Sequence, residues 1–343
     1  MDKRRNLLVT LADKHYVSQA KQLFSSVYWN AGWKGDLMLL SHDIPDSDLK
    51  WFTDKNILVK KCNPISDKRI GLNYHPAVLD KFYLFTEEFK KWKNIIFLDS
   101  DIIVRSSIDY LTQVKSIGAV RDVNLSKLGS HFFDLPKNQS GTCIYDMKTS
   151  AFNSGVISFN TDIITPETFN ELCSLFNEHS GNSKYGEQPV LNLYFYKKWE
   201  HLPLIYNLFI ISFNLKLPRR FKSIIIHFLH GKDHPALWDT ANPFYAEWKT
   251  NLEKADLIDP GKIQKSKHLN TFQITFYSVL LKIMSYIRIR QFIYSAYRGS
   301  GIFKAFIINI INTPNRLIGI IGNHLKRNNS DLYYRLKKIK DGK

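Results

Sequence analysis

Short apolar segments alternate with amphipathic helical patterns along the first hundred residues of this chain. The apolar segments are rich in Leu, Ile and Val and are too short for buried helices, so they predict buried strands. Strands that alternate with helices at this spacing predict an α/β fold with much parallel pairing. The expected strands cover residues 6–12, 36–41, 57–59 and 94–98, and the expected helices cover 17–29 and 76–89.

The middle of the chain continues this pattern less regularly. Further strands are expected at 155–159 and 223–229, and further helices at 166–179 and 186–196. In α/β sheets ligands bind beyond the carboxyl ends of the strands. Because Asp13, Asp99 and Asp101 follow predicted strands at such ends, we expect the chemistry there.

The sequence Asp99-Ser100-Asp101 directly follows the apolar strand at 94–98. Two carboxylates two residues apart at a strand end can converge on one divalent cation, and their oxygen atoms suit Mg²⁺ or Mn²⁺. A cation held there can bridge a diphosphate and offset its charge as it leaves. Taken alone, an Asp-x-Asp more often caps a loop or lies in a solvated turn. The buried strand before it favours the metal site.

A second polar group lies in the predicted strand 223–229 and in the loop that follows it. His227 could supply a third metal ligand. Gly231 would let the backbone approach a phosphate closely, and Lys232 could hold a phosphate as a point charge. A core histidine followed by an ordinary turn is the simpler alternative, and the Asp pair is what argues against it.

Six short motifs follow one another along the chain. They are Val9-Thr10-Leu11-Ala12-Asp13 with Tyr16, then Lys81, Phe97-Leu98-Asp99-Ser100-Asp101, Phe152-Asn153-Ser154-Gly155-Val156, Gly186-Glu187-Gln188 and the His227 segment. In this order and spacing they resemble the retaining glycosyltransferases of family eight, the glycogenin and bacterial lipopolysaccharide galactosyltransferase type. The resemblance covers roughly residues 6–250. It implies a GT-A fold, with a Rossmann-like mixed central sheet flanked by helices, in a catalytic domain at 1–258.

The resemblance also implies a role for each matching residue in sugar transfer from a UDP-sugar donor. Mn²⁺, or Mg²⁺, would be bound by Asp99, Asp101 and His227. The uracil and ribose would contact Leu11, Ala12, Asp13 and Tyr16, with Ser100 at the ribose. The donor's sugar or phosphates would contact Lys81, Gly231 and Lys232. The transferred sugar would be surrounded by the catalytic residues Asn153, Glu187 and Gln188. Tyr16 could equally pack on its helix, and Asn153 could form only a turn.

Two departures from the family pattern concern this site. Glu187 stands where the family usually has Asp, and its longer side chain could shift the selection of the sugar. The family's His-x-x-Gly-x-x-Lys-Pro-Trp segment is altered, because His227 and Gly231 lie one residue further apart. His234 stands where the lysine is expected, so either Lys232 or His234 could replace it.

The positive charge of the chain is concentrated in its last quarter. Residues 261–343 hold 16 Lys and Arg and two acids, a net charge of +14, which leaves +3 of the chain's +17 for residues 1–260. Aromatic and aliphatic residues there alternate with single cations, as in helices that lie on an anionic bilayer. We therefore expect a basic, helical, membrane-associating region at 259–343. A nucleic-acid-binding tail fits poorly with so many Ile and Phe residues, whereas a helical cap on the body or a dimer contact stays open.

The sequence leaves three hypotheses for function. The first is a Mn²⁺-dependent retaining transferase that moves a hexose from a UDP-sugar to an envelope glycan or lipid-linked saccharide, of the lipopolysaccharide or capsule type. The second is a glycogenin-like enzyme that glycosylates itself or another protein, and the third is an inactive nucleotide-sugar-binding scaffold. Because the amide of Gln188 is neutral and a poor nucleophile, attack on the same face of the donor sugar is favoured.

The location of the protein is predicted from what the sequence lacks. The N-terminus shows no apolar region long enough for a signal peptide, and no run of 18 apolar residues could span a bilayer. Cys62, Cys143 and Cys173 form no metal or disulfide pattern. We therefore expect a cytoplasmic enzyme that is held peripherally on the inner face of the plasma membrane.

Overall fold

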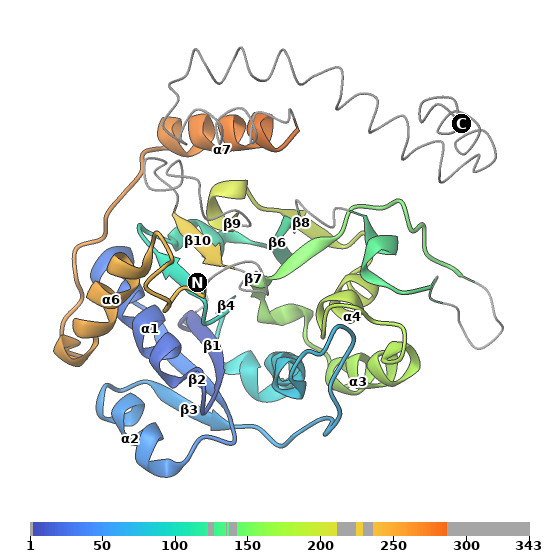
Figure 1. The fold of residues 1–343 in the computed structure, drawn as a ribbon, viewed down its shortest axis with the longest axis horizontal. Coiled ribbons are helices and arrows are strands. Elements are labelled where there is room, and N and C mark those ends of the chain that lie inside the picture. The colour runs from blue at the N-terminus through green and yellow to red at the C-terminus, as the bar shows by residue number, and fades with distance from the viewer. Residues whose placement is uncertain are drawn as a thin grey trace, which may run out of the picture. The chain divides into compact units, whose positions relative to one another are not determined.

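The computed structural model describes residues 3–122, 127–134, 136, 143–210, 224–228 and 236–286, and every structural statement below concerns these residues. The described residues up to Lys282 belong to one compact unit. Its centre is a mixed sheet with the strand order β3-β2-β1-β4-β7-β6-β8 (Figure 1). The strands are β1 (Leu7–Asp13), β2 (Asp36–His42), β3 (Leu58–Lys61), β4 (Asn94–Leu98), β6 (Ile117–Arg121), β7 (Phe152–Asn160) and β8 (Trp199–His201).

Strand β1 lies between two parallel neighbours, β2 and β4. Leu7, Leu8 and Val9 are fully buried, as expected for a strand with a continuous apolar run. Leu7 and Val9 belong to one hydrophobic cluster and Leu8 to another, so the sheet has a core on each face. Strand β7 runs antiparallel to β4 and β6 and makes the sheet mixed. The predicted fold class, a Rossmann-like mixed sheet flanked by helices, is confirmed.

Helices cover both faces of this sheet. Helix α1 packs on the Leu8 side with Leu23, Phe24 and Val27, and α6 packs against α1. The opposite face carries the 3-10 helix η1 (Pro76–Phe85), α3 and α4. Helix α2, which the sequence pattern did not predict, connects β2 to β3. The α-helices named here are α1 (Val17–Ala31), α2 (Asp46–Asp54), α3 (Thr168–His179), α4 (Gln188–Tyr194) and α6 (Tyr245–Glu253).

The helical segment predicted over residues 76–89 consists of two 3-10 helices, η1 (Pro76–Phe85) and η2 (Glu87–Lys91). Leu79, Phe82 and Phe85 are buried and lie three residues apart, which is the period of a 3-10 helix. The wider turn of an α-helix would progressively rotate these side chains away from one line. The sequence therefore predicted a helical segment here, and the structure adds the helix type.

A second, three-stranded sheet brings the histidine strand to the carboxyl end of β4. Strand β5 (Ile102–Val104) pairs antiparallel with β10 (Ile225–Phe228), which pairs in turn with β9 (Leu208–Ile210). His227 lies opposite Ile102 in this register. Because Ile102 directly follows the Asp-Ser-Asp turn, the register places His227 beside it.

The beginning of the predicted basic region is part of the compact unit. The Lys267 N–H donates a hydrogen bond to the Asn30 carbonyl of α1 at 2.9 Å. In helix α7 (Thr271–Tyr286), Tyr277 packs on the core cluster under α1, whereas Phe276 is 51% exposed. Within the predicted basic region, residues 271–286 are helical, whereas 259–270 form no helix.

Residues 287–343 lie outside the described residues. The predicted division at 258/259 and the helical character of the remaining tail therefore stay predictions. Within the described ranges, no helix combines the length and the apolar character that a membrane span needs.

Candidate active site

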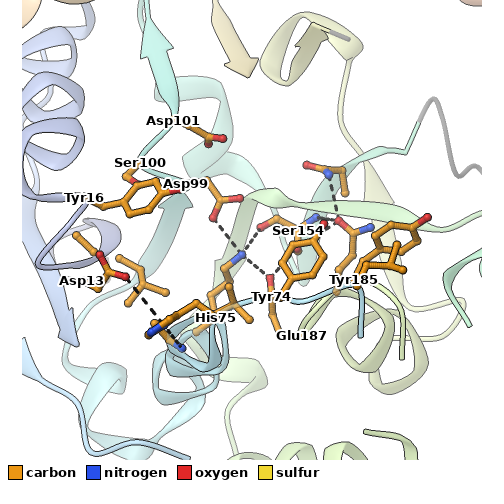
Figure 2. A pocket seen from close by; sticks show the side chains of 18 of the residues that line it. Asp13, Tyr16, Tyr74, His75, Asp99, Ser100, Asp101, Ser154, Tyr185 and Glu187 are labelled. Carbon is orange, nitrogen blue, oxygen red and sulfur yellow. Dashed lines mark hydrogen bonds and ion pairs between the residues drawn. The ribbon is translucent and has the colours of Figure 1, made fainter. Parts of the chain in front are cut away.

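A pocket of about 740 Å³ opens at the carboxyl ends of β1 and β4 (Figure 2). It brings together every predicted site residue that the structure describes, namely Leu11, Ala12, Asp13, Tyr16, Lys81, Asp99, Ser100, Asp101, Asn153, Glu187, Gln188 and His227. Gly231, Lys232 and His234 lie outside the described residues, so their expected phosphate contacts stay predictions.

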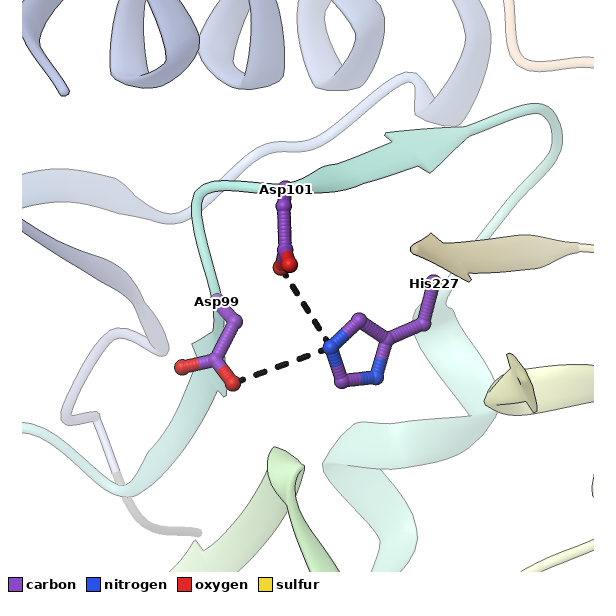
Figure 3. A group of neighbouring side chains, drawn as sticks. All are labelled: Asp99, Asp101 and His227. Atoms are coloured by element: carbon purple, nitrogen blue, oxygen red, sulfur yellow. Dashed lines mark ion pairs between the residues drawn. The ribbon is translucent and has the colours of Figure 1, made fainter. Parts of the chain in front are cut away.

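Asp99, Asp101 and His227 converge from the two sheets, with all three side chains directed at a common point (Figure 3). His227 Nε2 lies 3.3 Å from Asp101 Oδ1 and 3.8 Å from Asp99 Oδ2. One ligand atom from each residue lies within 4.8 Å of the others. Two carboxylates and one imidazole at these separations form a donor set that suits Mn²⁺ or Mg²⁺.

Asn207 fixes the orientation of the His227 ring. His227 Nδ1 lies 2.9 Å from Asn207 Oδ1, and since an amide oxygen only accepts, Nδ1 carries the proton. Nε2 faces the two aspartates, and in the neutral ring it carries the lone pair that can bind a cation. Asn207 Nδ2 also donates to Asn153 Oδ1 at 2.9 Å. Asn207 thus connects the predicted metal ligand to a predicted sugar contact, as residues behind metal ligands commonly do.

Gly155 of β7 leaves the space that this group needs. A Cβ at this position would lie 2.2 Å from His227 Cε1 and 2.7 Å from Asp99 Oδ2. Any side chain would therefore push the imidazole and the carboxylate apart. The Gly155 carbonyl also accepts a hydrogen bond from the Asp99 N–H at 2.8 Å, which fixes the backbone of the turn.

Charges at the site are concentrated in a largely buried space. Burial opposes the protonation of His227, but the neighbouring Asp101 and Asp99 carboxylates outweigh it and raise the pKa of the imidazole. Burial raises the pKa of Asp99, and Lys81 and His227 partly offset this effect. The concentration of negative charge around His227 is the electrostatic environment that a bound cation would compensate.

Lys81 of η1 is buried and lies between two carboxylates. Its Nζ is 3.1 Å from Asp99 Oδ1 and also forms a close ion pair with Glu187 Oε1. Burial alone would lower the pKa of this lysine, but Asp99 and Glu187 raise it, so the ammonium stays charged. Asp99 Oδ1 therefore faces Lys81, and Asp99 Oδ2 faces His227.

Gln188 is held by several hydrogen bonds at the start of α4. Its Oε1 accepts from Asn153 Nδ2 at 3.0 Å and from the Ser154 N–H at 2.9 Å. Its Nε2 donates to Asp122 Oδ2 at 3.3 Å. Both ends of the amide are thus occupied, which fixes the side chain against the pocket wall.

The opposite end of the pocket is lined by Asp13 and Tyr16. Asp13 Oδ1 accepts a hydrogen bond from the His15 N–H at 2.8 Å. The Tyr16 ring packs edge-on against Trp238, with 5.6 Å between the ring centroids. Burial, with the Asp101, Asp13 and Asp99 carboxylates, raises the pKa of Tyr16 to about 12, so its hydroxyl remains a donor.

The sequence profile described as Glycosyl transferase family 8 matches residues 7–233, about two thirds of the chain. The chain belongs to this family. Among its relatives, Glycosyltransferase GlyB of Streptococcus pneumoniae is 28% identical over 172 residues, which cover 46% of this chain and 38% of GlyB. Glycogenin-1 of Mus musculus is 29% identical over 208 residues, which cover 57% of this chain and 51% of the relative. The chain thus spans about half or less of the length of these relatives.

Solved structures of glycosyltransferases share the fold. The galactosyltransferase LgtC, solved in complex with donor and acceptor sugar analogs, superimposes with a TM-score of 0.57 at 14% identity, covering 72% of this chain and 95% of LgtC. The bifunctional glycosyltransferase WbbM gives a TM-score of 0.55 at 16% identity, covering 77% of this chain and 52% of WbbM. These similarities confirm the GT-A fold that the sequence predicted.

Several pocket residues of this family 8 chain were not predicted from its sequence. Asp122 and Tyr185 line the pocket and each accept a hydrogen bond from Gln188. Tyr74 and His75 line it near Glu187 and Asp13 (Figure 2). They lie in irregular segments without a periodic pattern, where a single sequence gives little signal. Trp238, which packs on Tyr16, was not predicted either: the family pattern has Trp directly after Pro, whereas Ala236 follows Pro235 in this chain.

Proposed function

We propose that this chain is a Mn²⁺-dependent retaining hexosyltransferase that uses a UDP-sugar donor. The observation that carries the proposal is the convergence of Asp99, Asp101 and His227 at the carboxyl end of β4, in one pocket with Lys81 and Gln188. When a divalent cation is bound by these three side chains, it offsets the charge of the donor's diphosphate.

The other residues are proposed to hold the donor and its transferred sugar. Lys81 brings a permanent positive charge to the floor of the pocket, where it can interact with a donor oxygen. Glu187 accepts from Ser154 Oγ at 2.8 Å and is thereby fixed, with room to accept from a sugar hydroxyl. Asp13 and Tyr16 are proposed to contact the nucleoside.

Retention of configuration is proposed to follow from attack on the face that the diphosphate leaves. The acceptor oxygen would bond to the anomeric carbon as the bond from that carbon to the diphosphate oxygen breaks, and the hydroxyl proton would pass to the departing diphosphate. Gln188 is a poor candidate for an enzyme nucleophile, because its Oε1 already accepts three hydrogen bonds. We propose that it orients the sugar.

The proposed acceptor is an envelope glycan or a lipid-linked saccharide of the lipopolysaccharide or capsule type. The basic region from residue 259 would bring the enzyme to an anionic membrane, with each cation near the surface worth about 1 kcal/mol. We also propose that the enzyme works in the cytoplasm, on the inner face of the plasma membrane. The exposed Phe272 and Phe276 on α7 are consistent with an interfacial helix.

The test is a panel of UDP-sugars, incubated with the protein and Mn²⁺ in the absence of an acceptor. One sugar should be hydrolysed slowly with release of UDP, and chelation of the metal should abolish the release. D99N and D101N should lose the activity while they keep the fold by circular dichroism. Release of no UDP from any donor would instead favour an inactive binding scaffold.

The similarity to Glycogenin-1 supports a second candidate, an enzyme that glycosylates a protein, itself included. Mass spectrometry separates the two candidates. After incubation with the UDP-sugar and Mn²⁺, a self-glycosylating enzyme gains mass in hexose steps, whereas an enzyme for a lipid-linked acceptor keeps its mass.

A further inference from the structure

Two histidines and two aspartates lie together at the ends of β1 and β2. Asp13 and His42 are paired in the register of these parallel strands, so their side chains project from the same face. His75, on the segment that leads into η1, faces Asp13 across the end of the pocket (Figure 2). Its Nδ1 lies 4.0 Å from Asp13 Oδ2. The proposed sugar transfer gives no role to His42, His75 or Asp80.

The hydrogen bond at the start of η1 decides which nitrogen of His75 carries the proton. Nδ1 accepts from the Ala77 N–H at 3.2 Å, so in the neutral ring the proton is on Nε2. Burial lowers the pKa of His75, which keeps the ring neutral. Within the described residues no group accepts from Nε2, and the side chain is 43% exposed towards the pocket that it lines. His75 therefore offers one N–H donor to a ligand.

A buried pair holds this histidine in place. The His75 ring packs edge-on against His42, with 5.4 Å between the centroids and 87° between the planes. His42 Nδ1 lies 2.7 Å from Asp80 Oδ2, and both side chains are almost fully buried. Within the described part of the chain, the second oxygen of Asp80 has no hydrogen-bond partner. A buried carboxylate with a single hydrogen-bond partner lowers the stability of the fold. A functional role therefore explains the His42–Asp80 pair better than a purely structural one.

We propose that His75 is a specificity-determining residue that reads the nucleobase together with Asp13, and that His42 and Asp80 are positioning residues for it. The Asp13 carboxylate accepts hydrogen bonds and His75 Nε2 donates one. This acceptor–donor couple matches the N3–H and the neighbouring carbonyl of uracil. Cytosine presents the opposite pattern, an acceptor at N3 and a donor amino group beside it. The inference rests on the proposed nucleotide-sugar donor site and deepens it.

The experiment is calorimetric titration of the full chain with UDP and with CDP in the presence of Mn²⁺. H75A should bind UDP about tenfold more weakly, since a hydrogen bond in a desolvated pocket is worth roughly 1.4 kcal/mol. Its affinity for CDP should change much less, so the preference for UDP over CDP should fall. H268A, which removes an exposed imidazole that does not line the pocket, is the matched control and should bind UDP like the wild type.

Two results would overturn the inference in different ways. If the wild type binds UDP and H75A keeps both its affinity and its preference over CDP, His75 does not read the base and the donor site stands. If the wild type does not bind UDP at all, the proposed donor is wrong and the inference fails with it.

A double-mutant cycle tests the positioning role. H42A should weaken UDP binding in the wild-type background and have no further effect in the H75A background, because it acts through His75. Additive losses would mean that His42 is only structural. If H42A folds poorly, H42Q keeps an N–H donor for Asp80 and removes the ring that packs on His75, and the same non-additivity is expected.

Discussion

Replacing Gly155 with alanine tests the metal centre without removing any of its ligands. The added Cβ would lie 2.2 Å from His227 Cε1 and 2.7 Å from Asp99 Oδ2, whereas ordinary contact begins near 3.4 Å. The imidazole would have to move by about 1 Å to restore van der Waals contact. It cannot move freely, because β10 pairs with β5 and β9 on its two sides and Asn207 holds Nδ1.

The expected losses follow from this displacement. A shift of about 1 Å in positioned groups can lower turnover about 100-fold. Disturbed metal ligands typically lose affinity by about 10- to 100-fold. The overpacked site should also cost about 1–3 kcal/mol in the free energy of unfolding.

The assay compares G155A with the wild type in Mn²⁺ titration and in hydrolysis of the UDP-sugar. G181A is the matched control, since nothing lies within 4 Å of a Cβ at Gly181, and it should behave like the wild type. Mn²⁺ affinity and turnover at the wild-type level in G155A would refute the proposed arrangement of the ligands.

Three further variants test other contacts in the pocket. N207A removes the acceptor of the His227 ring and should lower Mn²⁺ affinity about 10- to 100-fold in a titration, with unchanged affinity as the contrary result. K81M leaves the Asp99 and Glu187 carboxylates without their shared cation and should lower the free energy of unfolding by about 3–5 kcal/mol. Mn²⁺ should partly reverse this loss in denaturant unfolding, and equal losses with and without Mn²⁺ would argue against Asp99 as a ligand. Burial raises the pKa of Asp80 from 3.8 to about 6. The stability that the protonated carboxyl group contributes is therefore fully present below pH 4 and is lost as the pH rises through 6, and this loss is at most about 3 kcal/mol. D80N should lack this pH dependence, and parallel stability curves for D80N and the wild type from pH 4 to pH 8 would contradict it.

The sequence predicted the parts of the fold that have a strong local signal. The apolar runs of β1 and β4 are buried on both faces and continuous, so they were found with nearly correct bounds. The acids after β4 were predicted to converge on His227, and the β5–β10 register brings them together. The order of the motifs along the chain indicated that these three residues share one site, which composition alone could not indicate.

Other features depend on tertiary contacts that no local pattern encodes. Residues 76–85 form a 3-10 helix, and the apolar pattern of this segment predicts a helix without deciding its type. Asn207 follows a short 3-10 helix with no catalytic motif and gains its role only from its contacts with His227 and Asn153. The pairing of His42 with Asp80 joins positions 38 residues apart. Such pairs become visible only once the chain is folded.

The most direct test of the central claim is Mn²⁺ binding followed by electron paramagnetic resonance, with and without UDP. We predict one tight Mn²⁺ site per chain in the wild type, a spectrum that changes when UDP is added, and loss of the site in D101N and H227A. Mn²⁺ bound with equal affinity in these variants, or a spectrum that UDP leaves unchanged, would contradict a metal centre built from Asp99, Asp101 and His227.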